Sequence, residues 1–319
     1  MLWQSIYTSE NYRDKNMFSV ITPTYNRAHT LERVFNSLKQ QSNKDFEWII
    51  VDDASTDNTK KLVKSWVNLN LEFSIKYYLL DKNKGKPNAL NVGLEYCSRP
   101  FTVIADSDDT FVSNTIEDLQ KLWQMVDISD NANRIASIWT LVKNERGELV
   151  GEPFPSNFWQ VDLKGRILNR KAAVQGEKWH SWRTTVLRKY KMFHSDFSFI
   201  SEGSTWNRIN KDYDFLCINI IHRIYFSSPD GLILKEKTRL ELEKIKFYSS
   251  YYQLYQTPNW QILKYKYYQI HAFDHIKSIL TYRDPHMNLS STKILFCVLV
   301  TLWNTPKRLF YFLTLKLQK

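Results

Sequence analysis

The sequence predicts an α/β protein whose central sheet is mainly parallel and is flanked by helices. Short apolar runs alternate with amphipathic helical segments between residues 18 and 125. The apolar runs recur roughly every 25 to 30 residues, which is the spacing of βαβ units. Polar residues follow three of these runs, at the sheet edge where proteins of this class bind ligands.

The first two strand–helix pairs are clearly marked. The stretches FSVITP (18–23) and FEWIIVDD (46–53) are typical of buried strands. Residues 30–38 place four apolar side chains on one helical face, and residues 59–69 do the same. We therefore expect two consecutive βα units at the start of the fold.

The next two pairs follow the same pattern. FSIKYYLL (73–80) and FTVIAD (101–106) predict strands. Residues 87–96 and 114–125 predict helices, the first with a proline in its opening turn. A further strand-like run covers 134–142, after which the regular alternation ends. No GxGxxG sequence follows the first strand, which argues against a dinucleotide site.

The change in pattern predicts three regions along the chain. They are an N-terminal extension (1–16), a main α/β domain (17–228, with halves 17–128 and 129–228) and a basic, aromatic-rich helical region (229–319). The last region holds 14 Lys and Arg against 6 Asp and Glu, so most of the net charge of +11 lies there. A surface that binds an anionic partner is therefore expected in this region.

Three features bear on the cellular compartment. The N-terminus lacks the basic and apolar segments of a secretory signal. The apolar run Ile294–Trp303 has ten residues, whereas a helix that spans a membrane needs about 20. The three cysteines are far apart and show no metal-binding spacing, as expected for reduced thiols. We therefore expect a cytoplasmic protein.

The sequence VIADSDDT (103–110) places three carboxylates within four positions after a strand. Asp106, Asp108 and Asp109 repel one another unless a cation neutralises them. Mg²⁺ or Mn²⁺ typically takes one or two carboxylates together with substrate phosphates, so a metal–diphosphate site is the favoured interpretation. The alternative is that Asp109 or Ser113 only caps the next helix.

Asp52 and Asp53 end the second predicted strand in a similar way. A carboxylate at this position can accept a hydrogen bond from a nucleobase or from ribose hydroxyls. The following residues are also good turn and capping sequence, with Ser55 or Asp57 as the cap. We expect both functions, with one of the two aspartates facing a ligand.

Four motifs in order, SVITPTYNR, WIIVDDASTDNT, NKGKPNALNVGL and VIADSDD, resemble family 2 glycosyltransferases that build bacterial surface polysaccharides. The resemblance covers roughly Phe18 to Thr110. It implies the GT-A fold, with a Rossmann-like nucleotide-binding half and an acceptor half. It also implies an inverting, metal-dependent transfer of a sugar from a nucleotide-sugar donor, with UDP as the expected nucleotide.

The resemblance assigns roles to positions that match the motifs. Tyr25 would lie against the nucleobase, and Lys86 and Asn88 would approach the ribose-diphosphate or the sugar. Asp108, Asp106 and Asp109 would bind Mn²⁺ or Mg²⁺. The donor-binding set implied in this way is Thr22, Pro23, Thr24, Tyr25, Arg27, Asp52, Asp53, Lys86, Asn88, Asp106 and Ser107. For Lys86, a solvated loop charge is the alternative.

Inverting members of the family use a downstream carboxylate as the base. FISEGSTWNRI (199–209) resembles that element and makes Glu202 the candidate, with Asp196 as the second choice. A glutamate that only favours a helix N-terminus is the alternative. Many relatives carry Glu-Asp or Asp here, whereas this chain has Glu-Gly.

The C-terminal sequence suggests a second surface. ILFCVLVTLW, followed by PKRLFYFLTLKLQK, combines apolar and basic residues as a helix at an anionic membrane interface does. An ordinary core helix with a dimerising tail is the alternative, so the oligomeric state stays open. No nucleic-acid-binding motif is present, and we expect no nucleic-acid partner.

The expected partners are therefore a nucleotide-sugar donor and a saccharide or lipid-linked acceptor, at or near the inner membrane surface. Two other functions are alternatives. A nucleotidyltransferase needs a glycine-rich phosphate loop after the first strand, and TPTYNRAHT is not one. A non-catalytic, membrane-peripheral assembly protein fits less well, because the aspartate motifs are intact.

Overall fold

The computed structural model describes residues 17–170, 174–193, 200–227 and 237–316, with side chains up to residue 304. The described residues form two compact units. The first comprises Met1–Val150, Glu177–Lys189 and Ile218–Phe226; the second comprises Gly151–Gly176, Tyr190–Cys217 and Ser227–Lys319. The chain passes between the units several times, whereas the predicted domains are consecutive. The predicted boundaries stay a prediction.

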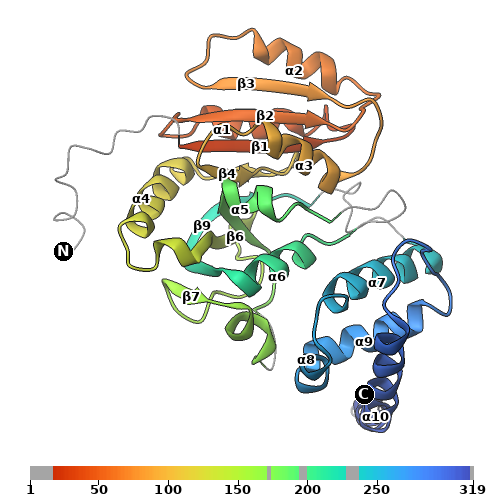
Figure 1. Ribbon diagram of the computed structural model, residues 1–319. Coiled ribbons are helices and arrows are strands. Elements are labelled where there is room, and N and C mark those ends of the chain that lie inside the picture. The colour runs from red at the N-terminus through yellow and green to blue at the C-terminus, as the bar shows by residue number, and fades with distance from the viewer. Residues whose placement is uncertain (1–16, 171–173, 194–199, 228–236, 317–319) are drawn as a thin grey trace. The chain divides into compact units, whose positions relative to one another are not determined.

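The first unit is built on a sheet whose opening four strands are parallel (Figure 1). These strands are β1 (Phe18–Thr24), β2 (Phe46–Asp52), β3 (Ser74–Leu79) and β4 (Phe101–Ile104), in the spatial order β3-β2-β1-β4. β1 pairs with β2 along its whole length, so Thr24 stands opposite Asp52 at the carboxyl ends. The polar residues that follow these strands therefore gather at one edge of the sheet.

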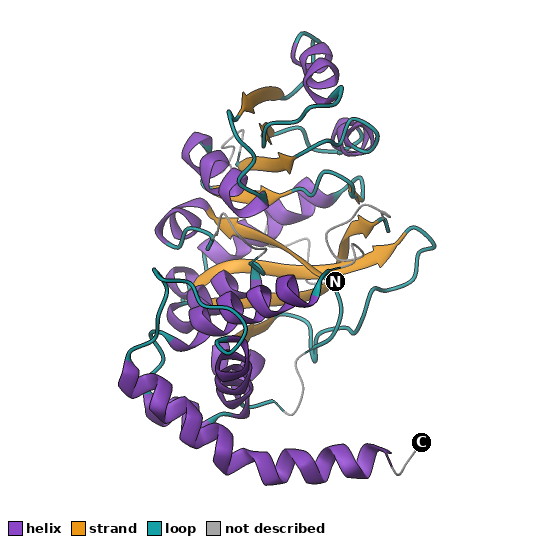
Figure 2. Ribbon diagram, turned by 90° about the vertical axis from the view of Figure 1, so that its right-hand side faces the viewer, coloured by secondary structure: helices purple, strands orange, loops and turns teal. Residues whose placement is uncertain are grey.

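Helices cover both faces of this sheet, as Figure 2 shows. They are α1 (Leu31–Lys39), α2 (Thr59–Val67), α3 (Lys86–Tyr96), α4 (Thr115–Asp127) and α5 (Thr184–Lys189). Phe35 of α1 and Trp66 of α2 both stack with Trp48 of β2, which places these helices on one face. α3 packs on the opposite face, where Gly93 lies so close to Ile21 that an added Cβ would stand 2.7 Å from its Cγ2.

Beyond β4 the sheet continues with further strands, one of which corresponds to the strand-like run predicted at 134–142. These are β8 (Lys178–Arg183), β6 (Ile135–Asn144), β9 (Asp214–Tyr225) and β5 (Thr110–Phe111), in that spatial order. β8 runs antiparallel to both β4 and β6, and β5 runs antiparallel to β9. A short 3₁₀ helix, η1 (Ala132–Arg134), precedes β6. β9 thereby brings residues near 223 beside the segment that follows β4.

The second unit contains mostly helices. Its elements are β7 (Trp159–Val161), the π-helix η2 (Lys164–Leu168), α6 (Gly203–Asp212), α7 (Arg239–Leu254), α8 (Asn259–Lys264), α9 (Lys266–Ser278) and α10 (Ser291–Lys316). Arg166 of η2 donates hydrogen bonds to Asn210 and Asn207 of α6, and Asn207 donates to Tyr267 of α9. The C-terminal helices therefore share a core with residues from the middle of the chain.

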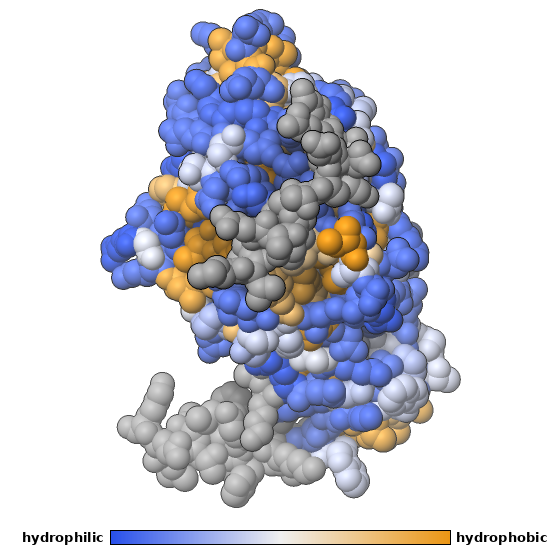
Figure 3. All heavy atoms as spheres, turned by 90° about the vertical axis from the view of Figure 1, so that its left-hand side faces the viewer, coloured by the Kyte–Doolittle hydropathy of each residue, from blue (hydrophilic) through white to orange (hydrophobic). Residues whose placement is uncertain are grey.

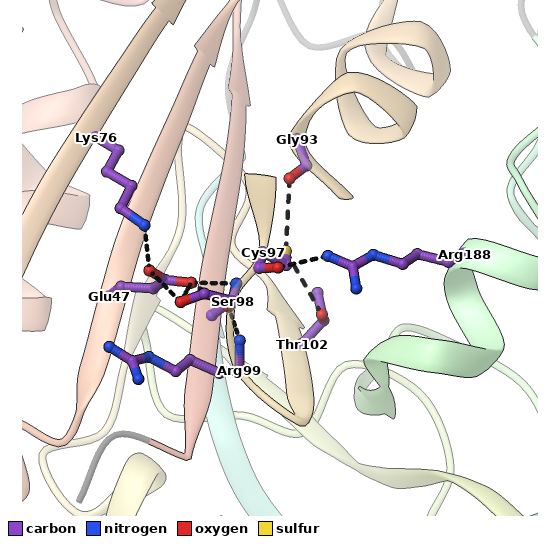
Figure 4. Close-up of polar contacts among 9 residues, drawn as sticks. Glu47, Lys76, Gly93, Cys97, Ser98, Arg99, Thr102 and Arg188 are labelled. Carbon is purple, nitrogen blue, oxygen red and sulfur yellow. Dashed lines mark hydrogen bonds and ion pairs between the residues drawn. The ribbon is translucent and has the colours of Figure 1, made fainter. Parts of the chain in front are cut away.

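A buried polar network holds the amino-end side of the first unit's sheet together (Figure 4). The Glu47 carboxylate accepts hydrogen bonds from Ser19 (2.6 Å), Lys76 (2.7 Å) and the Ser98 backbone N–H (2.7 Å). These residues come from β1, β3 and the turn before β4. One buried carboxylate thus ties three neighbouring segments to β2.

The predicted elements are confirmed in type and in order. Each of the eight strands and helices expected between residues 18 and 125 is present, and the run at 134–142 is β6. Among the described residues, no helix is long and apolar enough to cross a membrane. Figure 3 shows that hydrophilic residues cover most of the face it views, with an area of apolar surface near the middle. On the face in this view, apolar surface is therefore limited to patches.

Candidate functional site

The candidate site lies where the carboxyl ends of β1, β2 and β4 meet. The loops after β1 and β2 are joined by hydrogen bonds from the backbone N–H groups of Thr56 and Asp57 to the Asn26 side chain (2.8 and 3.3 Å). Asn26 adopts a positive φ of 52°, a conformation that asparagine tolerates better than most residues. The loop that carries Tyr25 and Arg27 is therefore fixed against its neighbour.

Residues of the loop after β1 differ in what they expose. The Tyr25 side chain is 43% exposed, so its ring is accessible to a ligand. Thr22 is buried and accepts a hydrogen bond from Trp48 Nε1 (2.8 Å), and Pro23 is buried as well. The buried Thr24 hydroxyl has no hydrogen-bond partner among the described residues. Arg27 is half-buried.

Asp52 and Asp53 are buried, and protein groups already occupy their oxygens. Asp52 accepts from the Ser55 N–H (2.7 Å) and from the Tyr77 hydroxyl (2.6 Å). Asp53 accepts from the N–H groups of Lys84 (3.0 Å) and Gly85 (2.6 Å). The two carboxylates thus hold the turn after β2 and the loop that leads into α3. A contact with a nucleobase stays a prediction.

The segment after β4 is held from one side by α1. The Thr30 hydroxyl donates to the Ser107 carbonyl (2.9 Å), and Arg33 donates to the Asp108 carbonyl (3.0 Å). Both bonds use main-chain oxygens of the aspartate segment. They fix the backbone and leave the Asp108 side chain for other partners.

Two protein cations neutralise two of the three carboxylates. Lys86, at the N-terminus of α3, forms an ion pair with Asp106 (2.5 Å). Arg223 of β9 lies 3.1 Å from the other oxygen of Asp106 and also pairs with Asp109. Burial alone would raise the pKa of Asp106, but Lys86 and Arg223 hold that pKa well below its usual range. Asp106 therefore stays ionised.

Asp109 is the most enclosed of the three. Its side chain is 1% exposed, and it accepts from Arg223 Nε (2.6 Å) and from the Phe226 N–H (2.9 Å). Both carboxylate oxygens are thus engaged. This geometry favours a structural role for Asp109, and its predicted metal contact stays a prediction.

Asp108 differs from its neighbours. Among the described residues, no side chain forms an ion pair or hydrogen bond with its carboxylate. Burial, reinforced by the adjacent Asp106 charge, raises the pKa of Asp108. Within the described ranges, the cations in direct contact with the three carboxylates are Lys86 and Arg223, so the uncompensated negative charge falls on Asp108. This arrangement attracts a further cation.

The remaining predicted residues are placed as follows. Asn88 is half-buried in the first turn of α3. Glu202 is half-buried at the N-cap of α6, in the second unit. Asp196, the second choice for the base, lies outside the described residues. In the described part of the chain, no group of three or more His, Cys, Asp or Glu side chains is arranged to hold a metal.

Sequence reasoning missed Arg223, Thr30 and Arg33. A signal for Arg223 was present, because an arginine inside the apolar run CINIIHRIY must find a carboxylate partner if the strand is buried. His180 of β8 also adjoins the site. Its Nδ1 accepts from Trp182 Nε1 (2.7 Å), and burial lowers the pKa of His180 to about 3. The imidazole is therefore a neutral, packed ring.

Comparison with known proteins gives a family for part of the chain. Residues 19–166 match the family model Glycosyl transferase family 2. GalNAc(5)-diNAcBac-PP-undecaprenol beta-1,3-glucosyltransferase of Campylobacter jejuni is 39% identical over 214 residues, which are 65% of this chain and 63% of that protein. UDP-Glc:alpha-D-GlcNAc-diphosphoundecaprenol beta-1,3-glucosyltransferase WfgD of Escherichia coli is 36% identical over 107 residues, 33% of this chain and 40% of that protein.

A comparison with solved structures addresses the fold. The crystal structure of S. aureus TarS 1-349 is similar to this chain with a TM-score of 0.54 at 21% identity, over 82% of this chain and 70% of that one. The expected GT-A-like fold is thereby confirmed. The chain spans less than two thirds of the length of both curated relatives described above.

Proposed function

Since residues 19–166 match the Glycosyl transferase family 2 model, we propose that the chain is an inverting, metal-dependent glycosyltransferase. It moves a sugar from a UDP-linked donor to a saccharide or lipid-linked acceptor in surface-polysaccharide synthesis. The two curated relatives described above are named for transfer to undecaprenol-linked acceptors, and one of them for UDP-Glc. Residues 17–228 form the catalytic domain in this proposal, and the reaction takes place at the cytoplasmic side of the membrane.

One observation carries the proposal: among the described residues no side chain pairs with the Asp108 carboxylate, whereas Asp106 and Asp109 beside it are paired with cations. A half-buried negative charge without a contacting cation is unfavourable, and such a charge is typical of a site that a ligand completes. Its position at the carboxyl end of β4 is where sheets of this class bind ligands. A nucleoside diphosphate that arrives with a cation supplies the missing positive charge.

The residues present fit Mn²⁺ or Mg²⁺ as that cation. Such ions accept one or two protein carboxylates and take their remaining ligands from phosphates and water. Asp108 would be the principal ligand and Asp106 the second, so a cluster of three protein ligands is not required. When bound, the metal would stabilise the charge of the departing diphosphate as a Lewis acid.

The other donor contacts follow from exposure and charge. The accessible Tyr25 ring offers a stacking surface for the base. Lys86 places an ammonium group next to Asp106, at the N-terminal end of α3, where a helix favours anionic groups. Lys86 can exchange its carboxylate partner for a donor phosphate without leaving this region.

The chemical step needs a base for the acceptor. In the proposal, the Glu202 carboxylate takes the proton from the acceptor hydroxyl while that oxygen bonds to the anomeric carbon. The bond from the anomeric carbon to the diphosphate oxygen breaks on the opposite face, so the configuration inverts and UDP leaves. The transition state is oxocarbenium-like, as in related glycosyl chemistry.

Calorimetry with UDP, GDP and CDP, each with and without Mn²⁺, tests the donor proposal. We expect Mn²⁺-dependent binding of UDP, and the absence of binding by all three nucleotides would refute it. Product analysis then separates the alternatives. A glycosyltransferase releases UDP from a UDP-sugar, a nucleotidyltransferase releases pyrophosphate from a nucleoside triphosphate, and a non-catalytic assembly protein releases neither.

A further inference from the structure

Helix α10 exposes a row of large apolar side chains. Leu295, Leu299, Leu302 and Trp303 are 60%, 57%, 62% and 73% exposed. Their spacing of four, three and one residues places them on one side of the helix. The opposite side carries the buried Cys297, which belongs to the core shared with α7, α8 and α9. The helix is thus apolar toward its own core and apolar toward the outside.

Such a row is unusual on a protein surface that stays in water. Single exposed leucines are common and need no explanation. Four large apolar residues on consecutive turns form a continuous surface, and continuous apolar surfaces mark sites of association. The row therefore indicates a surface that a partner covers.

The charge of the surrounding sequence points to an anionic partner. From Pro285 to Lys319 the chain contains five Lys and Arg and no Asp or Glu. Lys293 is used internally, because its Nζ donates to the carbonyl oxygens of Leu254 (2.9 Å) and Thr257 (2.7 Å). The other four cations belong to residues 307–319. A second copy of this chain would bring the same positive charge, which disfavours self-association through this helix.

We propose that α10 docks on the surface of a membrane that contains anionic lipids. The leucine row enters the boundary between headgroups and acyl chains, and Trp303 lies at headgroup level, where tryptophan is favoured. In this proposal the helix lies along the surface, because the apolar run Ile294–Trp303 has ten residues and a spanning helix needs about 20. The excess of Lys and Arg over Asp and Glu in the sequence from Pro285 onward favours lipids with anionic headgroups.

Vesicle cosedimentation of the full chain tests this docking. We expect the protein to bind vesicles that contain phosphatidylcholine and phosphatidylglycerol, and to bind pure phosphatidylcholine vesicles more weakly. Added salt should weaken binding to the vesicles that contain phosphatidylglycerol. The double variant Leu295→Ser/Leu299→Ser should lower the partition coefficient by at least about tenfold, because each leucine loses its gain from leaving water. Its matched control is Leu240→Ser/Leu242→Ser on α7, where the two leucines are 48% and 45% exposed.

Unchanged circular dichroism would show that both double variants are folded. The proposal is overturned if the α10 variant binds anionic vesicles as the wild type does, or if the control variant loses binding equally. It is also overturned if the wild type ignores vesicles and elutes as a dimer that the α10 variant converts to a monomer. Mn²⁺-dependent UDP binding, measured on the same samples, reports separately on the proposed enzymatic function.

Discussion

The same substitution at two adjacent carboxylates should give opposite results. Asp108→Asn removes a charge that no side chain in the described part of the chain pairs with, whereas Asp109→Asn removes one that holds Arg223. We expect the first variant to keep its stability and lose metal-dependent nucleotide binding. We expect the second to lose stability. The contrast depends on the contacts of two neighbouring residues and not on sequence pattern.

The magnitudes follow from burial and partners. The Asp109 side chain is 1% exposed and that of Arg223 is 10% exposed. Breaking their pair leaves the buried Arg223 guanidinium with Asp106 as its remaining carboxylate partner in the site. Removing one partner of a buried pair costs about 3–5 kcal/mol, and asparagine, which keeps one acceptor oxygen, should fall near the lower end. At Asp108 the loss of repulsion from Asp106 leaves the free energy of unfolding within about 0.5 kcal/mol of wild type.

Urea unfolding, followed by tryptophan fluorescence, measures the stability, and calorimetry measures UDP binding with Mn²⁺. Asp127→Asn is the matched control, because the Asp127–Arg183 pair has the same chemistry but side chains that are 29% and 24% exposed. It should cost about 1 kcal/mol or less. The reasoning fails if Asp108→Asn is as destabilising as Asp109→Asn, or if Asp109→Asn is no worse than the control.

Three further predictions address other parts of the chain. Glu47→Gln should destabilise the protein by about 2–4 kcal/mol in the same urea assay, because it uncouples Lys76 and leaves buried donors unmatched. Burial alone would raise the pKa of Glu47, but hydrogen bonds from Lys76 and two serines lower it, so this part of the stability is complete above about pH 4.5 and is lost as the pH falls further. A pH-independent difference between variant and wild type would contradict this. Gly93→Ala should lower the unfolding free energy by about 1–3 kcal/mol, because its Cβ would stand 2.7 Å from Ile21 Cγ2; an unchanged urea midpoint would show that α3 shifts freely. Glu202→Gln should keep UDP binding and lose transfer by at least about 100-fold, and full activity in a product assay would place the base elsewhere.

The local elements were predictable because their signals are local. Alternation of apolar runs with helical periodicity identified β1 to β4 and α1 to α4, since each buries one face or both faces against a neighbour. The aspartates at the strand ends could be found for the same reason, because parallel strands bring their carboxyl ends to one edge. These predictions needed only the order of elements along the chain.

The antiparallel part of the sheet and the partners of the aspartates were not predictable in this way. Arg223 contacts Asp109 across 114 positions of sequence, and nothing near either residue encodes which strand β9 joins. The hydrogen-bond donors of Glu47 were unpredictable for the same reason. It lies inside an apolar run and is buried, but its donors come from segments that only the sheet order brings together.

These long-range partners change the meaning of the aspartate motif. From the sequence, all three carboxylates are predicted to bind one metal ion. In the folded chain, Lys86 and Arg223 already form ion pairs with Asp106 and Asp109. Among the carboxylates of the motif, the charge left for an external cation to neutralise is therefore that of Asp108. A cation bound by so few protein ligands is held weakly until phosphate oxygens join it. Metal and donor should therefore bind with positive coupling, each raising the affinity of the other by the same factor, since such coupling is reciprocal.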